Sequence, residues 1–241
     1  MRAEKPEFLA DPSLSRDEME EMQRRIAGEA VFEDEYGFDP GLEDVKVAGV
    51  DQAFLDERAV SAAVVMENGE VVERVHGVEE LELPYIPGLL AFRETPSIVA
   101  ALEKLETEPD LLFLDGSGRI HFRQAGIATH VGVLFDVPAV GIAKNLLCGE
   151  PVEDTDNLEE GDRVEVVADN SVDTEPGTLI GYAFQSRQNA QGINPLYISS
   201  GHRINASTAV DFVERTCDGY KLPEPTRRAD SYVDQVKQEL K

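Results

Sequence analysis

Hydrophobic positions in this chain follow helical spacing first, then strand-like runs, then a mixture of the two. Residues 13–30 place apolar side chains at helical intervals, and Ser15 with Glu18 forms a capping-box pattern, so a helix is predicted there. Three strand-like runs follow, at residues 45–54, 59–67 and 71–78. The Asn68-Gly69 dipeptide between the last two predicts a tight hairpin turn. The middle of the chain is therefore expected to open with an antiparallel meander.

The second half of the chain alternates helical and strand-like patterns. Residues 89–105 show helical spacing, and the fully apolar run 111–114 predicts a buried strand that ends at Asp115. The other predicted elements are a helix at 126–135, a strand at 139–143, a strand pair at 162–168 and 178–184, a strand at LYIS, a helix at about 207–217 and a last helix beginning near Thr226.

No repeat, low-complexity tract or linker divides these elements, so one α/β domain over residues 1–241 is the simplest interpretation. Within it, an N-terminal helix at about 13–30 precedes a core at about 45–241. Three antiparallel strands followed by parallel strands, with helices between them, is the element order of ribonuclease H-like folds. We therefore expect a mixed sheet of this type, with helices on both faces.

The net charge of this chain is far more negative than that of an average protein. It carries 48 acidic against 22 basic residues, a formal net charge of −26, and arginine outnumbers lysine. Such a surface repels nucleic acid at ordinary salt. Dispersed carboxylates are, however, typical of halophilic proteins, whose molar salt shortens the Debye length to roughly 3 Å. Nucleic acid therefore stays within the range of expected partners.

Other bulk features exclude some classes of protein. No apolar run approaches the roughly 18–20 residues of a membrane helix, and the N-terminus lacks the plan of an export signal. Cys148 and Cys217 form no CxxC pair and are expected to be reduced thiols. These observations favour a cytoplasmic protein without a membrane partner.

Four acidic residues occupy unusual positions, within or at the end of apolar strands or in the first turns of helices. Asp51 lies inside the first strand pattern, Asp115 ends the later apolar strand, and Glu94 and Asp230 lie early in predicted helices. Taken singly, each is explained as a turn or a surface charge. Gathered at one sheet edge, four carboxylates would repel each other unless cations neutralise them. Oxygen ligands of this kind favour Mg²⁺, with Mn²⁺ as the alternative, and indicate phosphodiester hydrolysis.

Six sequence blocks in this chain resemble the endonuclease V family, nucleases directed at inosine. They are, in family order, VAGVDQAF, LPYIPGLLAFRE, LLFLDGSGRIHFRQAGIATHVGV, VPAVGIAKNLL, LYISSGHRI and GYKLPEPTRRAD. The resemblance implies a ribonuclease H-like fold, magnesium dependence and a role in DNA repair. It also implies nicking at the second phosphodiester bond 3′ to hypoxanthine, with the four acids as metal ligands and catalytic residues.

The same resemblance assigns further roles. It implies that a loop with Tyr85 at its centre forms a wedge that supports the opened base stack, built from Pro84, Tyr85, Ile86 and Pro87. It implies a base pocket lined by Gly88, Leu90, Gly116, Gly118, Gly126, Ile127, Gly141 and Leu147. An ordinary turn remains the alternative explanation for the loop and for individual glycines.

Lys144 and His121 complete the predicted catalytic set. By resemblance Lys144 is expected to steady charge on the scissile phosphate. His121 and His130 are candidates for phosphate contact or proton handling, with a hydrogen-bonded structural histidine as the alternative for each. His121 is placed in the catalytic set, and His202 is left out of it. The chain departs from the family pattern at Ser117, where the family has histidine, and at Phe122, where it has proline. Both departures affect the expected pocket rim rather than the four acids.

The expected partner is inosine-containing DNA, with RNA as an alternative, acted on by a monomer that needs no nucleotide cofactor. Three other functions remain open at this point: another ribonuclease H-like nuclease such as a branch resolvase, a nucleic-acid binding protein that does not cleave, and an enzyme acting on small phosphate esters. The complete set of four acids favours a nuclease over a binding protein.

Overall fold

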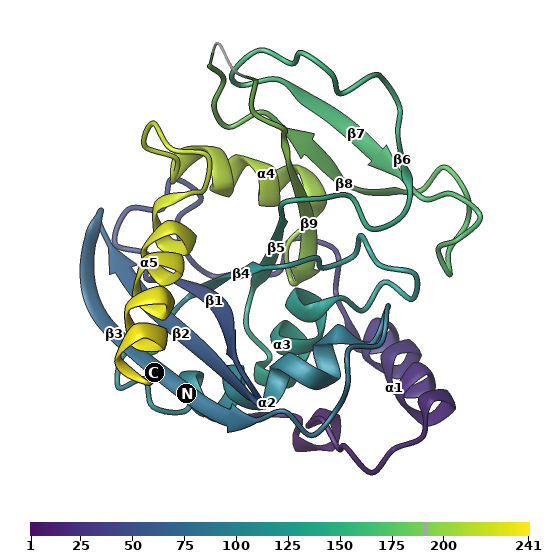
Figure 1. Cartoon of the computed structure of the whole chain (residues 1–241). Helices are drawn as coiled ribbons and strands as arrows, with labels where there is room; N and C mark the ends of the chain where they lie inside the picture. The colour runs from purple at the N-terminus through teal and green to yellow at the C-terminus, as the bar shows by residue number, and fades with distance from the viewer. Residues whose placement is uncertain (190–191) are drawn as a thin grey trace.

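The structure, a computed structural model, describes residues 1–189 and 192–241. Its strands are β1 (Val47–Leu55), β2 (Arg58–Glu67), β3 (Glu70–Glu80), β4 (Leu111–Asp115), β5 (Ala139–Ala143), β6 (Glu150–Pro151), β7 (Arg163–Val167), β8 (Leu179–Phe184) and β9 (Leu196–His202). Within the described residues they form one nine-stranded sheet in the order β3-β2-β1-β4-β5-β9-β8-β7-β6 (Figure 1).

The direction of the strands follows the predicted plan. β1, β2 and β3 form an antiparallel meander, and β4 and β5 extend it as parallel strands. Asn68 and Gly69 both adopt positive φ angles, 50° and 81°, as the predicted hairpin turn requires. The expected ribonuclease H-like mixed sheet is therefore confirmed. Beyond β5 the sheet continues with antiparallel strands, β9 to β6, an extension that the element order alone did not specify.

Helices cover both faces of the sheet, as expected. They are α1 (Arg16–Glu29), α2 (Leu90–Leu102), α3 (Ile127–Phe135), α4 (Ala206–Arg215) and α5 (Glu224–Glu239), with a 3₁₀ turn at η1 (Pro6–Phe8). Val50 of β1 packs in one core cluster with residues of α2 and α3, whereas Val47 packs in another with residues of α4. The side chains of a buried strand thus alternate between two cores.

The N-terminal helix is anchored rather than free. Ser15 caps α1 and forms the predicted reciprocal capping box with Glu18. Met19, Gln23 and Ile26 form its buried stripe. The helix lies against α3 and the loop before α2, at the lower right of Figure 1.

Close packing between β1 and α5 brings the last helix against the centre of the sheet. A Cβ atom on Gly49 would lie 2.0 Å from the carbonyl oxygen of Pro225. Only glycine therefore allows this approach of strand and helix. The two cysteines form no disulfide, as expected. Among the described residues, no helix is both long and apolar enough to span a membrane.

Candidate active site

Two carboxylates meet at the ends of the central parallel strands. Val50 of β1 pairs with Leu114 of β4, so Asp51 and Asp115 follow at neighbouring positions. Asp51 is only 4% exposed and accepts a hydrogen bond from the backbone N–H of Gln52 (2.7 Å). Burial, followed by the charge of Asp115 and a hydrogen bond with its carboxyl group, raises the pKa of Asp51 to about 9. The site thus holds a carboxyl group that water cannot stabilise.

Glu94 approaches the same place from α2. Its side chain is buried, and burial, together with the charge of Asp115, raises its pKa to about 7. Asp230 comes from α5, on the face opposite to α2, and about half of its side chain is exposed. The four acids predicted from the sequence therefore come from two strands and two helices that converge on one edge.

Lys144 lies among these acids, just after β5. Its ammonium nitrogen Nζ donates a hydrogen bond to Oδ2 of Asp115 (2.7 Å) and lies 3.9 Å from Oδ1 of Asp230. Burial alone would lower the pKa of Lys144, but Asp115, Asp51 and Asp230 together raise it. The lysine is therefore a permanent positive charge that partly neutralises the carboxylates.

The donor set suits a hard divalent cation. All four acids offer oxygen, and two of them are buried carboxyl groups with raised pKa values. Lys144 compensates the charge of Asp51 only in part, and Arg93 compensates that of Glu94 only in part. In the described part of the chain, however, no three acidic, histidine or cysteine side chains converge closely enough to hold an ion as they stand.

A recess of about 270 Å³ opens beside Asp51, Glu94 and Asp115. Six residues of the predicted base pocket line it: Gly88, Leu90, Gly116, Gly126, Ile127 and Leu147. Its volume is near the lower limit for small-molecule sites.

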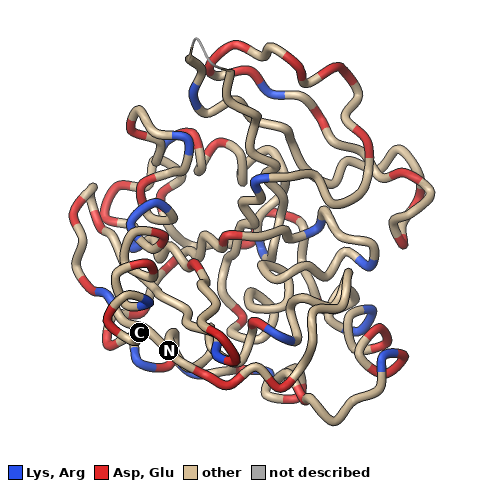
Figure 2. The backbone as a smooth tube through the Cα atoms, in the orientation of Figure 1, with Lys and Arg blue, Asp and Glu red and all other residues tan. Residues whose placement is uncertain are grey.

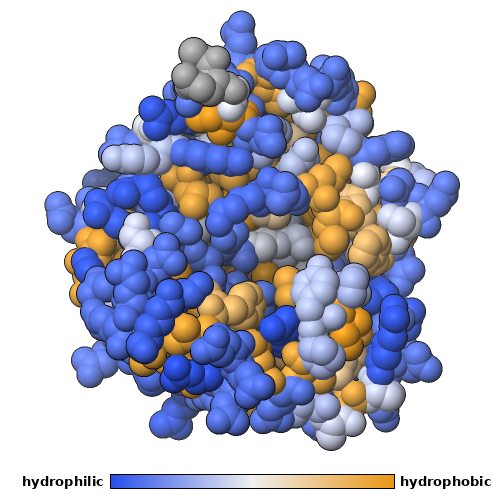
Figure 3. All heavy atoms as spheres, viewed as in Figure 1, coloured by the Kyte–Doolittle hydropathy of each residue, from blue (hydrophilic) through white to orange (hydrophobic). Residues whose placement is uncertain are grey.

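The rim of this recess is apolar. Eight large hydrophobic side chains are exposed in the described part of the chain, and four of them line the recess: Phe54, Tyr85, Leu90 and Leu147. The visible surface is otherwise mostly hydrophilic (Figure 3). Exposed aromatic and aliphatic groups around a small cavity suit the flat face of an unstacked base.

Two predicted pocket glycines do not line the recess. A Cβ on Gly118 would meet the carbonyl oxygen of Ser200 at 2.1 Å, and one on Gly141 would meet the amide nitrogen of Gly118 at 2.3 Å. These glycines instead allow the loop after β4 to pack tightly on β5 and β9. They therefore support the wall of the recess without contacting its interior.

The predicted wedge loop lies between β3 and α2, with Pro84, Tyr85 and Pro87 exposed and Ile86 packed towards α1. Tyr85 is 64% exposed and lines the recess, while Pro84, Ile86 and Pro87 lie beside it without lining the recess. An exposed aromatic ring between two prolines is stiffly held and available for stacking. The geometry is compatible with the expected wedge.

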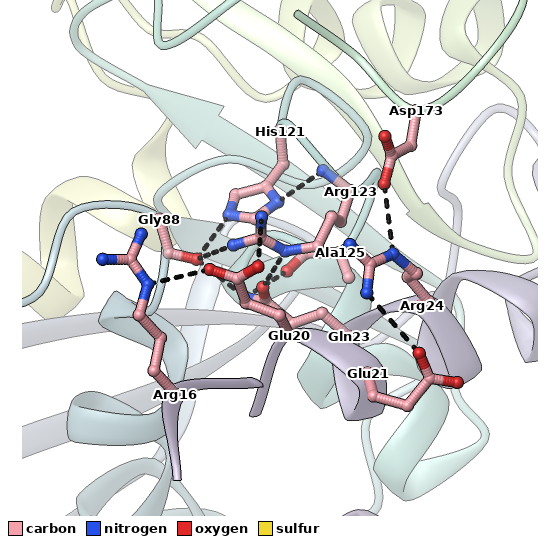
Figure 4. A network of polar contacts seen from close by, with 10 residues as sticks. All are labelled: Arg16, Glu20, Glu21, Gln23, Arg24, Gly88, His121, Arg123, Ala125 and Asp173. Carbon is pink, nitrogen blue, oxygen red and sulfur yellow. Dashed lines mark hydrogen bonds and ion pairs between the residues drawn. The ribbon is translucent and has the colours of Figure 1, made fainter. Parts of the chain in front are cut away.

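His121 lines the recess, but both of its ring nitrogens have partners (Figure 4). The backbone N–H of Arg123 donates to Nδ1 (3.2 Å), so Nε2 carries the proton and donates to the carbonyl oxygen of Gly88 (3.1 Å). Burial, and then the charge of Arg123, lower the pKa of His121 to about 4. These contacts favour a role in holding the loop over the catalytic role expected from the sequence.

The other histidines considered in the sequence have structural contacts. His130 is fully buried and its Nε2 bonds to the carbonyl oxygen of Phe8 (2.7 Å). His202 accepts from the backbone N–H of Val31 and bonds to Asp136.

Sequence reasoning missed several residues of the recess. Gln52, Phe54 and Ala91 also line it. Each lies close in sequence to Asp51 or Leu90, which the sequence analysis singled out, so adjacency along the chain was the available signal. Ser117, placed at the pocket rim by the sequence analysis, also lines the recess. Phe122, the second departure from the family pattern, packs beside Gly88, as expected for a change at the pocket rim.

Comparison with known proteins agrees with this geometry. A family model for Endonuclease V matches residues 29–231. Endonuclease V of the halophilic archaeon Natronomonas pharaonis is 59% identical over 237 residues, covering 96% of each protein.

Solved structures show the same fold. The crystal structure of Endonuclease V from Streptomyces avermitilis is 34% identical, covers 96% of both chains and superposes with a TM-score of 0.82. Endonuclease V of Ciona intestinalis, solved in complex with a 24mer DNA containing an inosine followed by a ribo-adenosine, gives a TM-score of 0.78 at 24% identity, covering 93% of this chain and 98% of that one. Because the family model covers most of its length and a relative is more than half identical to it, this chain belongs to the endonuclease V family of DNA-cleaving hydrolases.

Proposed function

We propose that this protein is a divalent-metal-dependent endonuclease that recognises hypoxanthine in DNA and hydrolyses the second phosphodiester bond 3′ to it. The observation that carries the proposal is a small recess with an apolar rim placed directly beside buried carboxylates. The complex of the Ciona intestinalis relative with inosine-containing DNA supports the choice of base. RNA is the alternative substrate, and the protein acts as a monomer without a nucleotide cofactor.

The proposed metal ligands are Asp51, Glu94, Asp115 and Asp230. Mg²⁺ is the expected ion and Mn²⁺ the alternative, because both prefer oxygen ligands. A bound ion supplies Lewis-acid stabilisation of phosphate charge and lowers the pKa of a nucleophilic water. The two buried carboxyl groups would then be compensated in a way that Lys144, near Asp51, and Arg93, near Glu94, do not achieve.

The chain's own residues would do the rest. The unstacked base enters the recess, where backbone groups near Gly88 and Gly116 lie against it without intervening Cβ atoms. Tyr85 stacks on the strand that the base has left. The ammonium group of Lys144, already next to Asp115, steadies negative charge on the scissile phosphate.

The proposal is tested by cleavage of labelled strands. The substrates are single and double strands carrying inosine in DNA or in RNA, matched strands without inosine, and a four-way junction. We expect a nick at the second phosphodiester bond 3′ to inosine, and only when Mg²⁺ or Mn²⁺ is present. Preferential cutting of the junction, or equal cutting without inosine, would overturn the proposed specificity.

Variants separate chemistry from binding. Asp51→Ala and Asp115→Ala are each expected to abolish nicking while leaving lesion binding largely in place, as measured by electrophoretic mobility shift. A variant that nicks at the wild-type rate would remove that residue from the proposed metal site.

A further inference from the structure

The N-terminal helix contributes one polar side chain to the interior of the protein. Gln23 lies one helical turn from Met19 and from Ile26 on the buried face of α1, and it is fully buried. A carboxamide at such a position costs about 1–3 kcal/mol unless its hydrogen bonds are made. The partners of Gln23 therefore explain why a glutamine is tolerated in this stripe.

Those partners belong to the two walls of the recess (Figure 4). The side-chain nitrogen Nε2 of Gln23 donates to the carbonyl oxygen of Gly88 (2.9 Å) and lies 3.5 Å from that of Ala125. Gly88 ends the wedge loop and lines the recess, and Ala125 immediately precedes Gly126, which lines the recess and caps α3. One carboxamide thus joins the loop before α2 to the start of α3.

The carbonyl group of Gly88 is the centre of this network. Besides Gln23 it accepts from Nε2 of His121 (3.1 Å) and from NH2 of Arg123 (3.4 Å). Gly88 has a φ of +78°, a backbone conformation that residues with a side chain rarely adopt. Three donors therefore converge on the carbonyl oxygen of a residue whose backbone conformation requires glycine.

Arg123 is held in turn by α1. Its Nε donates to Oε1 of Gln23 (2.7 Å), and its NH1 lies 3.6 Å from Oε2 of Glu20. Glu20 also pairs with Arg16. Both ends of the Gln23 carboxamide are consequently occupied, one by the recess backbone and one by the arginine that contacts the same carbonyl.

We propose that Gln23 is a positioning residue for base selection. By tying Gly88 to Ala125 it fixes the separation of the two recess walls, and this separation decides which purines enter. The inference rests on the proposed function, because it names the element of the same site that sets its selectivity. Gln23 touches neither the base nor the phosphate.

The first experiment compares Gln23→Met with Gln23→Glu. Methionine keeps the volume and removes all three bonds, whereas glutamate keeps the acceptor for Arg123 and removes the donor to Gly88. Arg24→Gln is the matched control, because Arg24 lies on the same helix with half of its side chain exposed and pairs only with Glu21 and Asp173 among the described residues.

The readout is the ratio of kcat/KM for hypoxanthine strands to that for strands with guanine or adenine at the same position. We expect this ratio to fall about ten-fold in both Gln23 variants, within the range that small changes in a binding pocket produce. The Arg24 control should keep the wild-type ratio. Gln23 variants that remain folded, by thermal unfolding, and keep the wild-type ratio would overturn the proposal.

A second experiment works without catalysis. The sequence contains no tryptophan, so Tyr85→Trp provides a single fluorescent reporter on the wedge loop. Adding Gln23→Met to this variant should lower the fluorescence anisotropy of the indole, because the loop loses its hydrogen bond to α1 and keeps only apolar contacts with that helix. Unchanged anisotropy overturns the proposed tie. If the wild type fails to cut inosine strands while the anisotropy still falls, the proposed function is wrong and the positioning role of Gln23 stands.

Discussion

At the scale of single residues, Asp51 is a carboxyl group in an environment that disfavours its charged form. It is a carboxyl group on a central strand, almost without contact with water, next to a second carboxyl group. Its raised pKa means that the folded protein resists ionising it, whereas the unfolded chain ionises it freely above its ordinary pKa. A cation in the site would remove this penalty.

Added Mg²⁺ should therefore stabilise the protein itself. At concentrations well above Kd, we expect a rise in Tm, because binding to the folded state alone shifts unfolding by about 3 kcal/mol at one hundred times Kd. Asp51→Asn should lose most of this rise, and the exposed Asp17→Asn should keep it. Differential scanning calorimetry at constant KCl provides the measurement, and a full Mg²⁺ response in Asp51→Asn would contradict the proposed ligand.

His121 gives a pH prediction because burial lowers its pKa in the folded protein. Its pKa is lowered from 6.5 to about 4, so the unfolded chain binds more protons than the folded protein between these values. Its contribution to stability is complete above pH 6.5 and is lost as the pH falls towards 4, about 3 kcal/mol in all.

Replacing this histidine isolates the effect from the many acids that titrate in the same range. His121→Gln should show a shallower loss of unfolding free energy between pH 6.5 and 4 than the wild type, measured by urea denaturation. Parallel pH profiles for the two proteins would show that folding does not shift the pKa of His121.

At the scale of elements, the contact between β1 and α5 links the sheet to Asp230. Gly49→Ala should lower the free energy of unfolding by about 1–3 kcal/mol, because a Cβ there collides with the backbone of Pro225. Nicking should fall further than stability explains, since Asp230 moves with the helix. Gly28→Ala in α1, where a Cβ meets nothing within 4 Å, is the control and should stabilise by about 0.5–1 kcal/mol.

Local patterns were sufficient to predict most elements. The capping box at Ser15, the hairpin dipeptide at Asn68 and the apolar run before Asp115 each depend on neighbours in the chain, and the structure has all three. The short strand β6 escaped prediction because two residues carry no period. The antiparallel continuation beyond β5 depends on which strands pair, and strand direction leaves no mark on hydrophobic spacing.

In the candidate site, too, features that depend on neighbours in the chain could be predicted, and features that depend on distant contacts could not. Asp51 and Asp115 could be found because a charge within or at the end of an apolar strand stands out in the sequence. Glu94 and Asp230, in helices, were selected only as members of the set of four.

Gln23 could not be found in this way, because a glutamine in an amphipathic helix is typical of an exposed position. Its partners, Gly88 and Ala125, lie 65 and 102 residues away. Roles that arise only from distant contacts need the fold before they can be recognised.

At the scale of the whole molecule, negative charge dominates. Acidic residues are spread along the entire chain, on helices, strands and loops alike (Figure 2). With a net charge of −26, self-repulsion destabilises the folded state at low ionic strength, and screening relieves it. The relative in a halophilic archaeon agrees with a protein adapted to high salt.

Salt should therefore act on this protein in the reverse of the usual direction. We expect Tm to rise and nicking to persist or increase from low to molar KCl, whereas ordinary protein–DNA binding weakens steeply over this range. Thermal scans and initial rates along a KCl series provide the measurements. Activity that falls steadily with KCl would contradict the halophilic interpretation and leave the family assignment intact.

The placement of the acids has an evolutionary consequence. Asp51 and Asp115 lie on strands whose other side chains build both hydrophobic cores, so substitutions near them disturb folding and chemistry together. The loops that line the recess, in contrast, also hold side chains that belong to neither of these cores, and Ser117, one of the two expected departures from the family pattern, is among them. Descendants of such a scaffold are expected to acquire new lesion preferences through these loops while inheriting an unaltered hydrolytic centre.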